Sequence, residues 1–256
     1  MKANKKEQFR HEAKYLIGLK EKELLTQHFD SILSLDKYAT NGGYTIRSLY
    51  FEDYWNSSYE EKEAGILMRK KYRIRVYNFS ERSIKLERKR KFENYIYKEA
   101  APLTREETEK IIQGDYAFLL HSPHALCREF YFECMTNVMR PRVIVDYERE
   151  PWVYDTGTVR LTFDSNVRAA IGSYDIFDES LPTLPVLQPG KLVFEVKYTE
   201  LLPQIIKNII PPQASEFLAV SKYVLCYEKT RYLHDFEYWY DTCLLYTSPS
   251  GLARQT

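Results

Sequence analysis

Glycine and paired cysteines are scarce in this chain. Only nine of its 256 residues are glycine, which argues against a fold that cradles nucleotide phosphates in a glycine-rich loop. The four cysteines are scattered and form no CxxC pair; they are Cys127, Cys134, Cys226 and Cys243. This spacing argues against a zinc site and against a disulfide scaffold, and it favours a reducing compartment such as the cytosol.

Long apolar runs and an excess of one charge are also missing. No stretch approaches the ~20 apolar residues of a membrane span, and the N-terminus lacks the apolar centre of a signal peptide. The net charge is only +1, so no bulk positive field points to nucleic acid as a partner. Any binding site for anions must therefore come from local sorting of charged residues.

What the chain does contain is a series of short alternating segments, interrupted by helical patterns. Strands are predicted at residues 8–17, 42–53, 67–78, 82–92, 95–100, 139–149, 157–166 and 190–198. Helices are predicted at residues 19–36, 124–137, 199–208 and 215–228, with a short one ending at Gly65. A capping box from Thr104 to Glu107 and a stop at Gly114 predict one more helix. Three prolines between the last two strands indicate a loop; they are Pro182, Pro185 and Pro189.

This order of elements predicts an α+β fold, in which helices are inserted between antiparallel strands, because a regular βαβ rhythm is absent. We expect residues 1–240 to form a single domain. Residues 241–256 show no periodicity and extend no element, so we interpret them as a disordered or non-native tail.

Charge is sorted along the predicted strands. In KYRIRVY, residues 71–77, three cations alternate with apolar residues. Because alternate residues of a strand share a face, one face is cationic and the other is apolar. Five further strands follow the same pattern. Their charged faces hold Glu12 and Lys14 (strand 8–17), Lys85, Glu87, Lys89 and Lys91 (strand 82–92), Lys98 (strand 95–100), Arg160 and Asp164 (strand 157–166), and Glu195 and Lys197 (strand 190–198).

Neighbouring rows of arginine and lysine repel one another unless an anion lies between them. The helices are expected to cover the apolar faces, so the cationic faces point into a groove or a closed barrel lumen. Such a lumen suits a polyanion, since arginine binds phosphate oxygens in pairs and lysine adds a point charge. A carboxylate there can hold a divalent cation that bridges phosphate oxygens. For any single strand, an ordinary solvated face is the alternative.

The sequence resembles the VTC domain in the order of seven motifs: FRHEAKYLI, KYRIRVY, IKLERKRK, YEREPWVY, VRLTFDSNV, VFEVKY and SKY, within about residues 8–230. This is the polyphosphate polymerase domain of the vacuolar transporter chaperone complex and its bacterial relatives, in the triphosphate tunnel metalloenzyme superfamily. The resemblance implies an antiparallel eight-stranded tunnel β-barrel with a cationic lumen and with helices packed outside. It also implies transfer of the terminal phosphoryl group of ATP to a growing polyphosphate chain, with a divalent metal, Mn²⁺ or Mg²⁺.

Carried over position by position, the resemblance implies contacts to the phosphates from Lys14, Arg73, Arg75, Lys85, Lys98, Arg149, Arg160 and Lys222. Glu195 matches the metal-binding glutamate, although it could instead be a salt-bridge partner of Lys197. The superfamily opens with an ExExK pattern, whereas Arg10 stands here at the first position, which favours the polymerase branch and a metal held by few carboxylates. Three residues before Lys222, where the family can carry a second lysine, this chain has Ala219.

Three functions stay open at this point: a polyphosphate polymerase, a hydrolase of tripolyphosphate or nucleoside triphosphates, and a non-catalytic polyphosphate-binding module. The expected partners are ATP and polyphosphate or tripolyphosphate, and not nucleic acid. We expect a cytoplasmic protein without a membrane span, which could reach the inner face of a membrane through a membrane protein partner. Glu12 and Glu87 are expected to balance neighbouring cations rather than to bind metal.

Overall fold

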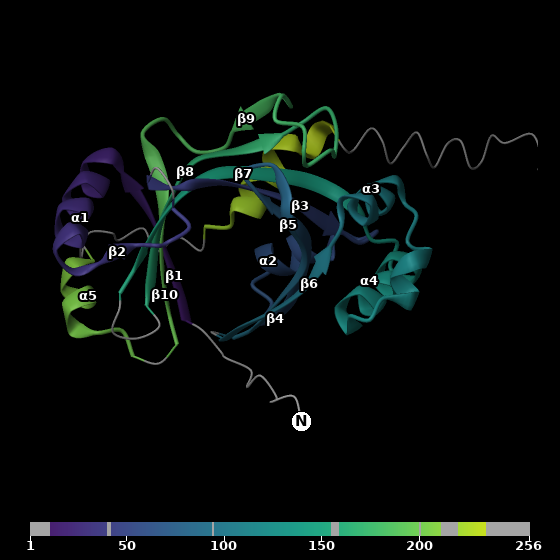
Figure 1. Ribbon diagram of the computed structural model, residues 1–256, viewed down its shortest axis with the longest axis horizontal. Coiled ribbons are helices and arrows are strands. Elements are labelled where there is room, and N and C mark those ends of the chain that lie inside the picture. Colours follow the sequence, from purple (N-terminus) through teal and green to yellow (C-terminus); the bar gives the residue numbers. More distant parts are fainter. Residues whose placement is uncertain are drawn as a thin grey trace, which may run out of the picture.

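The structure, a computed structural model, describes residues 11–39, 42–93, 95–154, 159–199, 201–210 and 220–233 (Figure 1). Its strands are β1 (His11–Gly18), β2 (Ser34–Leu35), β3 (Tyr44–Glu52), β4 (Met68–Tyr77), β5 (Ser80–Phe92), β6 (Tyr95–Leu103), β7 (Arg140–Val153), β8 (Arg160–Ala170), β9 (Thr183–Pro185) and β10 (Lys191–Tyr198). Its helices are α1 (Leu19–Ile32), α2 (Ser57–Glu63), α3 (Arg105–Gln113), the 3-10 helix η2 (Ala117–His121), α4 (Ala125–Thr136), α5 (Gln204–Ile209) and a further helix over residues 222–233. Among the described residues, no helix is both long and apolar enough to cross a membrane.

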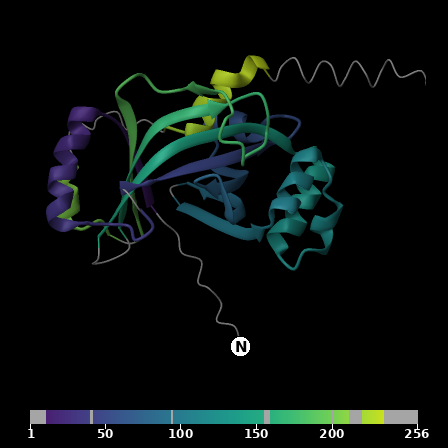
Figure 2. The same cartoon turned by 45° about the horizontal axis from the view of Figure 1, so that its top comes forward.

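All strands belong to one antiparallel sheet, in which eight follow the order β1-β10-β8-β7-β3-β4-β5-β6. The sheet curls, so that β1 and β10 lie opposite β4, β5 and β6 (Figures 1 and 2). The two edge strands approach each other, since the rings of His11 on β1 and Tyr95 on β6 are 5.9 Å apart. The prediction of an α+β fold with an eight-stranded antiparallel barrel is confirmed.

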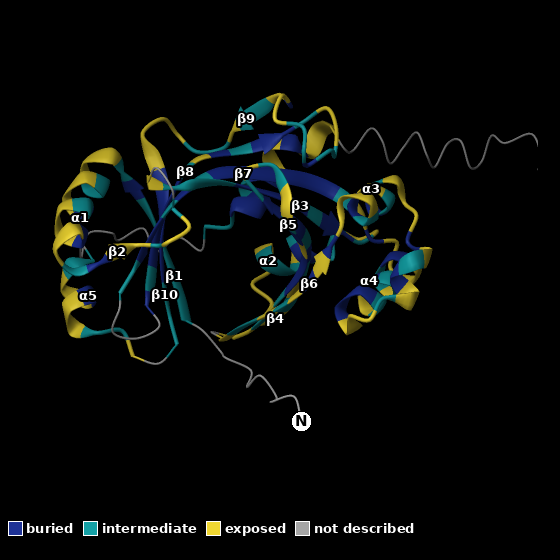
Figure 3. Cartoon of the chain, viewed as in Figure 1, coloured by how far each residue is buried: buried dark blue, intermediate teal, exposed yellow. Residues whose placement is uncertain are grey.

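Helices cover the outward face of the sheet at two places. Tyr72 and Ile74 of β4, both fully buried, pack with residues of α3 and α4 in one core cluster. On the other side, Phe194 of β10 packs with Phe29 of α1 and Ile206 of α5. Burying each such side chain contributes about 1.5–3 kcal/mol, so the apolar positions of the alternating strands must face outward here. Figure 3 shows that much of the sheet is buried, with exposed positions on β4, β5 and β6, while the outer sides of α1 and α4 are exposed. Alternation then turns the charged positions inward.

The helix over residues 222–233 is an exception to the prediction of helices outside. Its residues Tyr223, Val224 and Tyr227 belong to a third core cluster, together with Ile46 of β3 and Val145 of β7. Alternation places Ile46 of β3 and Val145 of β7 on the inward face of the sheet, like the charged side chains. This helix therefore covers part of the inward face and leaves the rest to charged side chains.

Local sequence signals explain how the strands are held in register. β4 and β5 are joined by a two-residue turn, in which Asn78 and Phe79 both have positive φ, 48° and 54°. Such turns twist with the strands they join, and asparagine adopts this conformation more readily than most residues. The side chain of Asn78 also accepts a hydrogen bond from the backbone N–H of Thr45, at 2.8 Å. The turn thus fixes the charged face of β4 against that of β5 and ties both to β3.

The predicted capping box is confirmed. The Thr104 hydroxyl accepts a hydrogen bond from the Glu107 N–H at 3.1 Å, and the Glu107 carboxylate accepts one from the Thr104 N–H at 2.8 Å. The helix α3 ends at Gly114, whose φ of 87° is the left-handed conformation that glycine favours.

Several boundaries differ from the prediction. The loop expected between the last two strands contains the short strand β9, and β8 extends to Ala170. The helix predicted over 19–36 ends at Ile32, and the last residues of that range instead form β2, a two-residue strand that pairs with β7 and is too short to show a periodicity. The helix expected over 199–208 is shorter, as α5, and the one expected over 215–228 runs over 222–233. The expected start of the first strand at residues 8–10, part of the 215–228 helix and the tail from residue 241 lie outside the described residues.

Candidate functional site

A first group of charges lies where β4, β5 and β6 pair, and we call it the Glu87 cluster: Arg73, Arg75, Glu87 and Lys98. Arg73 stands directly opposite Glu87 in the β4–β5 ladder, and its Nε and Nη2 atoms lie 2.8 and 2.7 Å from Glu87 Oε2. Arg75 lies 4.0 Å from the same oxygen, and Lys98 of β6 forms an ion pair with Oε1. One buried carboxylate thus faces three cations.

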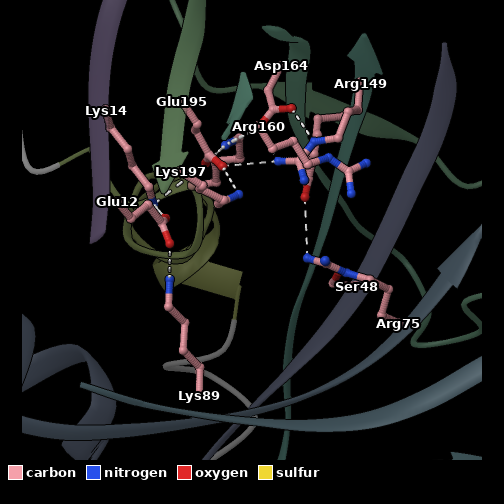
Figure 4. A network of polar contacts seen from close by, with 12 residues as sticks. Glu12, Lys14, Ser48, Arg75, Lys89, Arg149, Arg160, Asp164, Glu195 and Lys197 are labelled. Carbon is pink, nitrogen blue, oxygen red and sulfur yellow. Dashed lines mark hydrogen bonds and ion pairs between the residues drawn. The ribbon is translucent and has the colours of Figure 1, made fainter. Parts of the chain in front are cut away.

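A second group, the Glu195 cluster, connects β1, β5, β7, β8, β10 and the helix over residues 222–233 (Figure 4). Its members are Glu12, Lys14, Lys89, Arg149, Asp164, Glu195, Lys197 and Lys222. Lys89 bridges across the curled sheet to Glu12 of β1 at 2.9 Å. The two clusters together hold eight cations and four carboxylates, an excess of four positive charges.

Glu195 is the centre of its cluster. Its Oε1 atom lies 2.7 Å from Lys222 and 3.7 Å from Lys14. Its Oε2 atom lies 2.5 Å from Lys197 and 3.2 Å from Arg149. The alternative in which Glu195 pairs with Lys197 alone therefore describes only one of its four contacts.

Tyr147 of β7 lies between the two clusters. Its hydroxyl is 3.3 Å from Arg75 Nη2 of the Glu87 cluster. On the other side, its ring centroid lies 5.2 Å from the Arg149 guanidinium and 4.9 Å from the Lys222 ammonium. Since an aromatic face attracts cations, Tyr147 lets positive groups of the two clusters approach each other without another carboxylate between them.

The net effect of burial and neighbouring charges is to lower the pKa of the Glu195 carboxylate and also those of two lysines. Burial raises the pKa of Glu195, but the charges of Lys197, Lys222 and Lys14 outweigh it and hold this pKa well below its usual range. Burial lowers the pKa of Lys197 to about 8, although Glu195 opposes the shift. Burial likewise lowers the pKa of Lys98 to about 8, against the charge of Glu87. Glu195 is therefore ionised at neutral pH, while burial makes Lys197 and Lys98 easier to deprotonate than ordinary lysines.

A family model described as the VTC domain matches residues 9–231 of the chain. The chain belongs to the VTC domain family. This confirms the resemblance seen in the seven sequence motifs, and it supports an activity related to triphosphates. No curated protein matches the chain.

Solved structures resemble this VTC domain at low similarity. A proposed adenylate cyclase from Bacillus halodurans is 14% identical, with a TM-score of 0.48 over 76% of this chain and 82% of its own. A proposed adenylyl cyclase from Hippeastrum, described by a dominant triphosphatase activity, is 11% identical, with a TM-score of 0.48 over 87% of this chain and 96% of its own. A proposed adenylate cyclase from Vibrio parahaemolyticus is 10% identical, with a TM-score of 0.43 over 83% and 90%. At these TM-scores, the similarities carry no argument about function.

The predicted phosphate-binding residues of the VTC domain mostly come together. The two clusters contain Lys14, Arg73, Arg75, Lys98, Arg149 and Lys222. Arg160 lies on the same face of β8 as Asp164 but pairs elsewhere, with Asp36 at 3.0 Å and with the Tyr44 hydroxyl at 2.9 Å. Lys85 stands opposite Arg75 in the ladder but is exposed. These two residues lie outside the two clusters.

Some residues of the site were not assigned a role from the sequence. Lys89 and Lys197 share faces with assigned residues, so the alternating pattern could have identified them. Asp164 also shares a face with Arg160, but its partners could not be inferred, because they depend on which strand lies beside β8. Tyr147 could not be assigned a role, because its contacts depend on which strands lie beside β7. Tyr50 of β3, whose hydroxyl lies 2.8 Å from Arg73 Nη1, belongs to the same class.

The carboxylates of the VTC domain fit a divalent ion only in part. Within the described ranges, no group of three or more His, Cys, Asp or Glu side chains could hold a metal ion. The Lys14 ammonium lies between Glu12 and Glu195, 3.0 and 3.7 Å from their Oε1 atoms, so positive charge is favoured at this point. Mn²⁺ and Mg²⁺ are commonly held by one or two carboxylates together with substrate phosphates. The donors thus fit an ion that binds with phosphate, and not one held by protein alone.

Proposed function

We propose that this VTC domain is a metal-dependent polyphosphate polymerase that transfers the terminal phosphoryl group of ATP to a growing polyphosphate chain. The observation that carries the proposal is the excess of four positive charges over the carboxylates of the two clusters. A triphosphate carries several negative charges at close spacing, and the cations stand in rows at strand spacing on facing parts of one curled sheet. A single phosphate would leave most of these cations without a counter-charge.

In this proposal, the protein binds and orients phosphates while charge redistributes among their oxygens. Arg73 and Arg75 present guanidinium groups that can bind two oxygens at once. Lys98, Lys14 and Lys222 add charges that stabilise the transition state, since phosphoryl transfer depends on positioning and on electrostatic stabilisation. The phosphate oxygens would lie beside these cations. Arg160 and the exposed Lys85 are proposed to guide the chain outside the clusters.

Glu195 is proposed to hold the divalent ion together with the phosphates, while Glu12 balances Lys14 and Lys89. When bound, such an ion neutralises charge on the phosphate oxygens. The cations around Glu195 keep its carboxylate ionised, so it is ready to accept the ion at neutral pH.

A second candidate function, non-catalytic polyphosphate binding, is favoured by one observation. Both oxygens of Glu195 already contact cations, at distances of 2.5 to 3.7 Å. If those cations keep their contacts when phosphate is bound, Glu195 serves only as their counter-charge. The module would then bind polyphosphate without turning it over.

Incubation of the purified protein with ATP and Mn²⁺ tests the proposal. A polymerase yields long-chain polyphosphate on a gel, a hydrolase yields orthophosphate only, and a binding module yields neither. Arg73→Ala should lower the rate of product formation about a hundredfold. Arg105→Ala is the matched control, because Arg105 of α3 is exposed and pairs with Glu109 of the same helix and with Glu81 of β5, away from both clusters. Release of orthophosphate without polyphosphate would refute the polymerase and retain the hydrolase.

A further inference from the structure

Asp164 is a fully buried acid on the inward face that is not among the residues to which the proposed function gives a role. Both of its oxygens are occupied by cations from different parts of the fold. Oδ1 lies 2.6 Å from Arg149 Nε, and Oδ2 lies 2.6 Å from Arg149 Nη2. Oδ2 also lies 2.5 Å from Lys222 Nζ. Asp164 therefore joins a neighbouring strand and the helix over residues 222–233.

The backbone around Asp164 explains why it can hold both partners. Arg149 of β7 stands directly opposite Asp164 in the β7–β8 ladder, so the guanidinium reaches the carboxylate along the sheet. Lys222 begins the helix over residues 222–233, and the next residues, Tyr223 and Val224, pack in the core cluster on the inward face. The Lys222–Asp164 contact, together with the Lys222–Glu195 contact, thus connects this helix to the charged site.

We propose that Asp164 is a positioning residue, which rests on the proposed function: it holds Arg149 and Lys222 where phosphate oxygens bind. With both oxygens engaged, Asp164 is suited to this task and not to holding an ion. The burial of the trio strengthens the attraction, since charge pairs in a low-dielectric interior interact more strongly than in water. Burial also keeps the two cations from swinging into solvent between turnovers.

Removing this charge has two opposite effects. Without Asp164, Glu195 is the nearest remaining carboxylate for both Arg149 and Lys222, and it already contacts Lys14 and Lys197. The site becomes more positive, which favours binding of an anion. The two cations also lose their fixed positions, which lowers the rate of a reaction that needs aligned groups. An acid with a purely structural role would not lower the rate of turnover while leaving anion binding unchanged or stronger.

Asp164→Asn tests the inference, because it keeps the shape of the side chain and removes its charge. We expect kcat for Mn²⁺-dependent consumption of ATP to fall between about tenfold and a hundredfold, while KM and the Kd of tripolyphosphate stay unchanged or decrease. Asp146→Asn is the matched control, because Asp146 is equally buried and pairs in the same bidentate manner with Arg47, outside both clusters. The control should keep wild-type kcat and KM per folded molecule. An unchanged kcat in Asp164→Asn, or a raised KM or a raised Kd of tripolyphosphate, would overturn the inference.

Two further measurements separate this inference from the proposed function. Hydrogen exchange of residues 222–233 should speed up in Asp164→Asn, and added tripolyphosphate should slow it again, because the anion replaces the lost charge. If the wild-type protein neither consumes ATP nor binds tripolyphosphate, the proposed function is wrong. If hydrogen exchange of residues 222–233 is the same in Asp164→Asn as in wild type, the positioning role of Asp164 is wrong as well. If Asp164→Asn folds only with tripolyphosphate present, the inference is supported. If it fails to fold even then, while Asp146→Asn folds, Asp164 is structural and the inference is wrong.

Discussion

Replacing Arg73 by alanine separates a phosphate-binding arginine from a structural one. Arg73 makes two contacts to Glu87, at 2.8 and 2.7 Å, and one to the Tyr50 hydroxyl at 2.8 Å. Its removal leaves Glu87 with Lys98 and with Arg75 at 4.0 Å, so this carboxylate stays paired. The loss also relieves repulsion in a site where cations are in excess. We therefore expect the free energy of unfolding to fall by only about 1 kcal/mol, because no buried charge is left without a partner.

The effect on phosphate should be much larger. Losing one donor that stabilises developing charge costs about 3 kcal/mol, or about a hundredfold in rate. Arg73→Lys keeps the charge but loses the planar fork, so it should recover only part of this loss. Turnover of ATP with Mn²⁺ and calorimetry with tripolyphosphate at low salt measure the two effects.

Arg47→Ala provides the contrast in stability. Arg47 is 1% exposed and forms a bidentate pair with the fully buried Asp146, at 2.8 and 2.7 Å. Its removal leaves that acid without its bidentate partner, and we expect a loss of about 3–5 kcal/mol. For a chain of this size, that corresponds to a melting temperature lower by roughly 6–20 °C. If Arg73→Ala melts as early as Arg47→Ala, or keeps wild-type turnover and binding, our assignment of Arg73 is wrong.

Three further predictions concern the charges of the site. Glu195→Gln should retain tripolyphosphate binding but lose Mn²⁺-dependent turnover, and its free energy of unfolding should fall by about 3–5 kcal/mol because four cations lose a shared partner. Full activity of this variant at limiting Mn²⁺ would show that Glu195 is only a counter-charge. Mn²⁺ should bind measurably only when a non-hydrolysable triphosphate analogue is present, as titration by electron paramagnetic resonance can show, and tight binding to the protein alone would contradict a shared site. Because the pKa of Lys98 and that of Lys197 are lowered to about 8, these lysines lose protons as pH rises through 8 and regain them when an anion binds. Tripolyphosphate affinity should therefore fall between pH 7 and pH 9. Calorimetry at pH 8.5, in buffers of different ionisation enthalpy, should show less proton uptake on binding for Lys98→Met than for wild type.

The sequence alone predicted which residues face inward. On β4, alternation with a period of two separates Arg73 and Arg75 from Tyr72 and Ile74, and burial of the apolar positions under α3 and α4 forces the arginines to the other face. Local sequence motifs, such as the capping box from Thr104 to Glu107, were predicted equally well. Such features depend on contacts within a few residues, so no knowledge of the rest of the chain is needed.

The tertiary structure decided which inward-facing charges meet. The contact of Lys89 with Glu12 joins residues 77 positions apart, and it exists because the sheet curls until β1 lies near β5. The ion pair between Asp164 and Lys222 forms because the helix over residues 222–233 packs on the inward face of the sheet. The sequence had instead predicted that the helices lie outside. Lys85 carries the same pattern as Lys89 yet is exposed, since it lies elsewhere along the same strand. Periodicity gives the face of a residue, but the curl and register of the sheet set its distance to the other charges, and phosphate recognition depends on those distances.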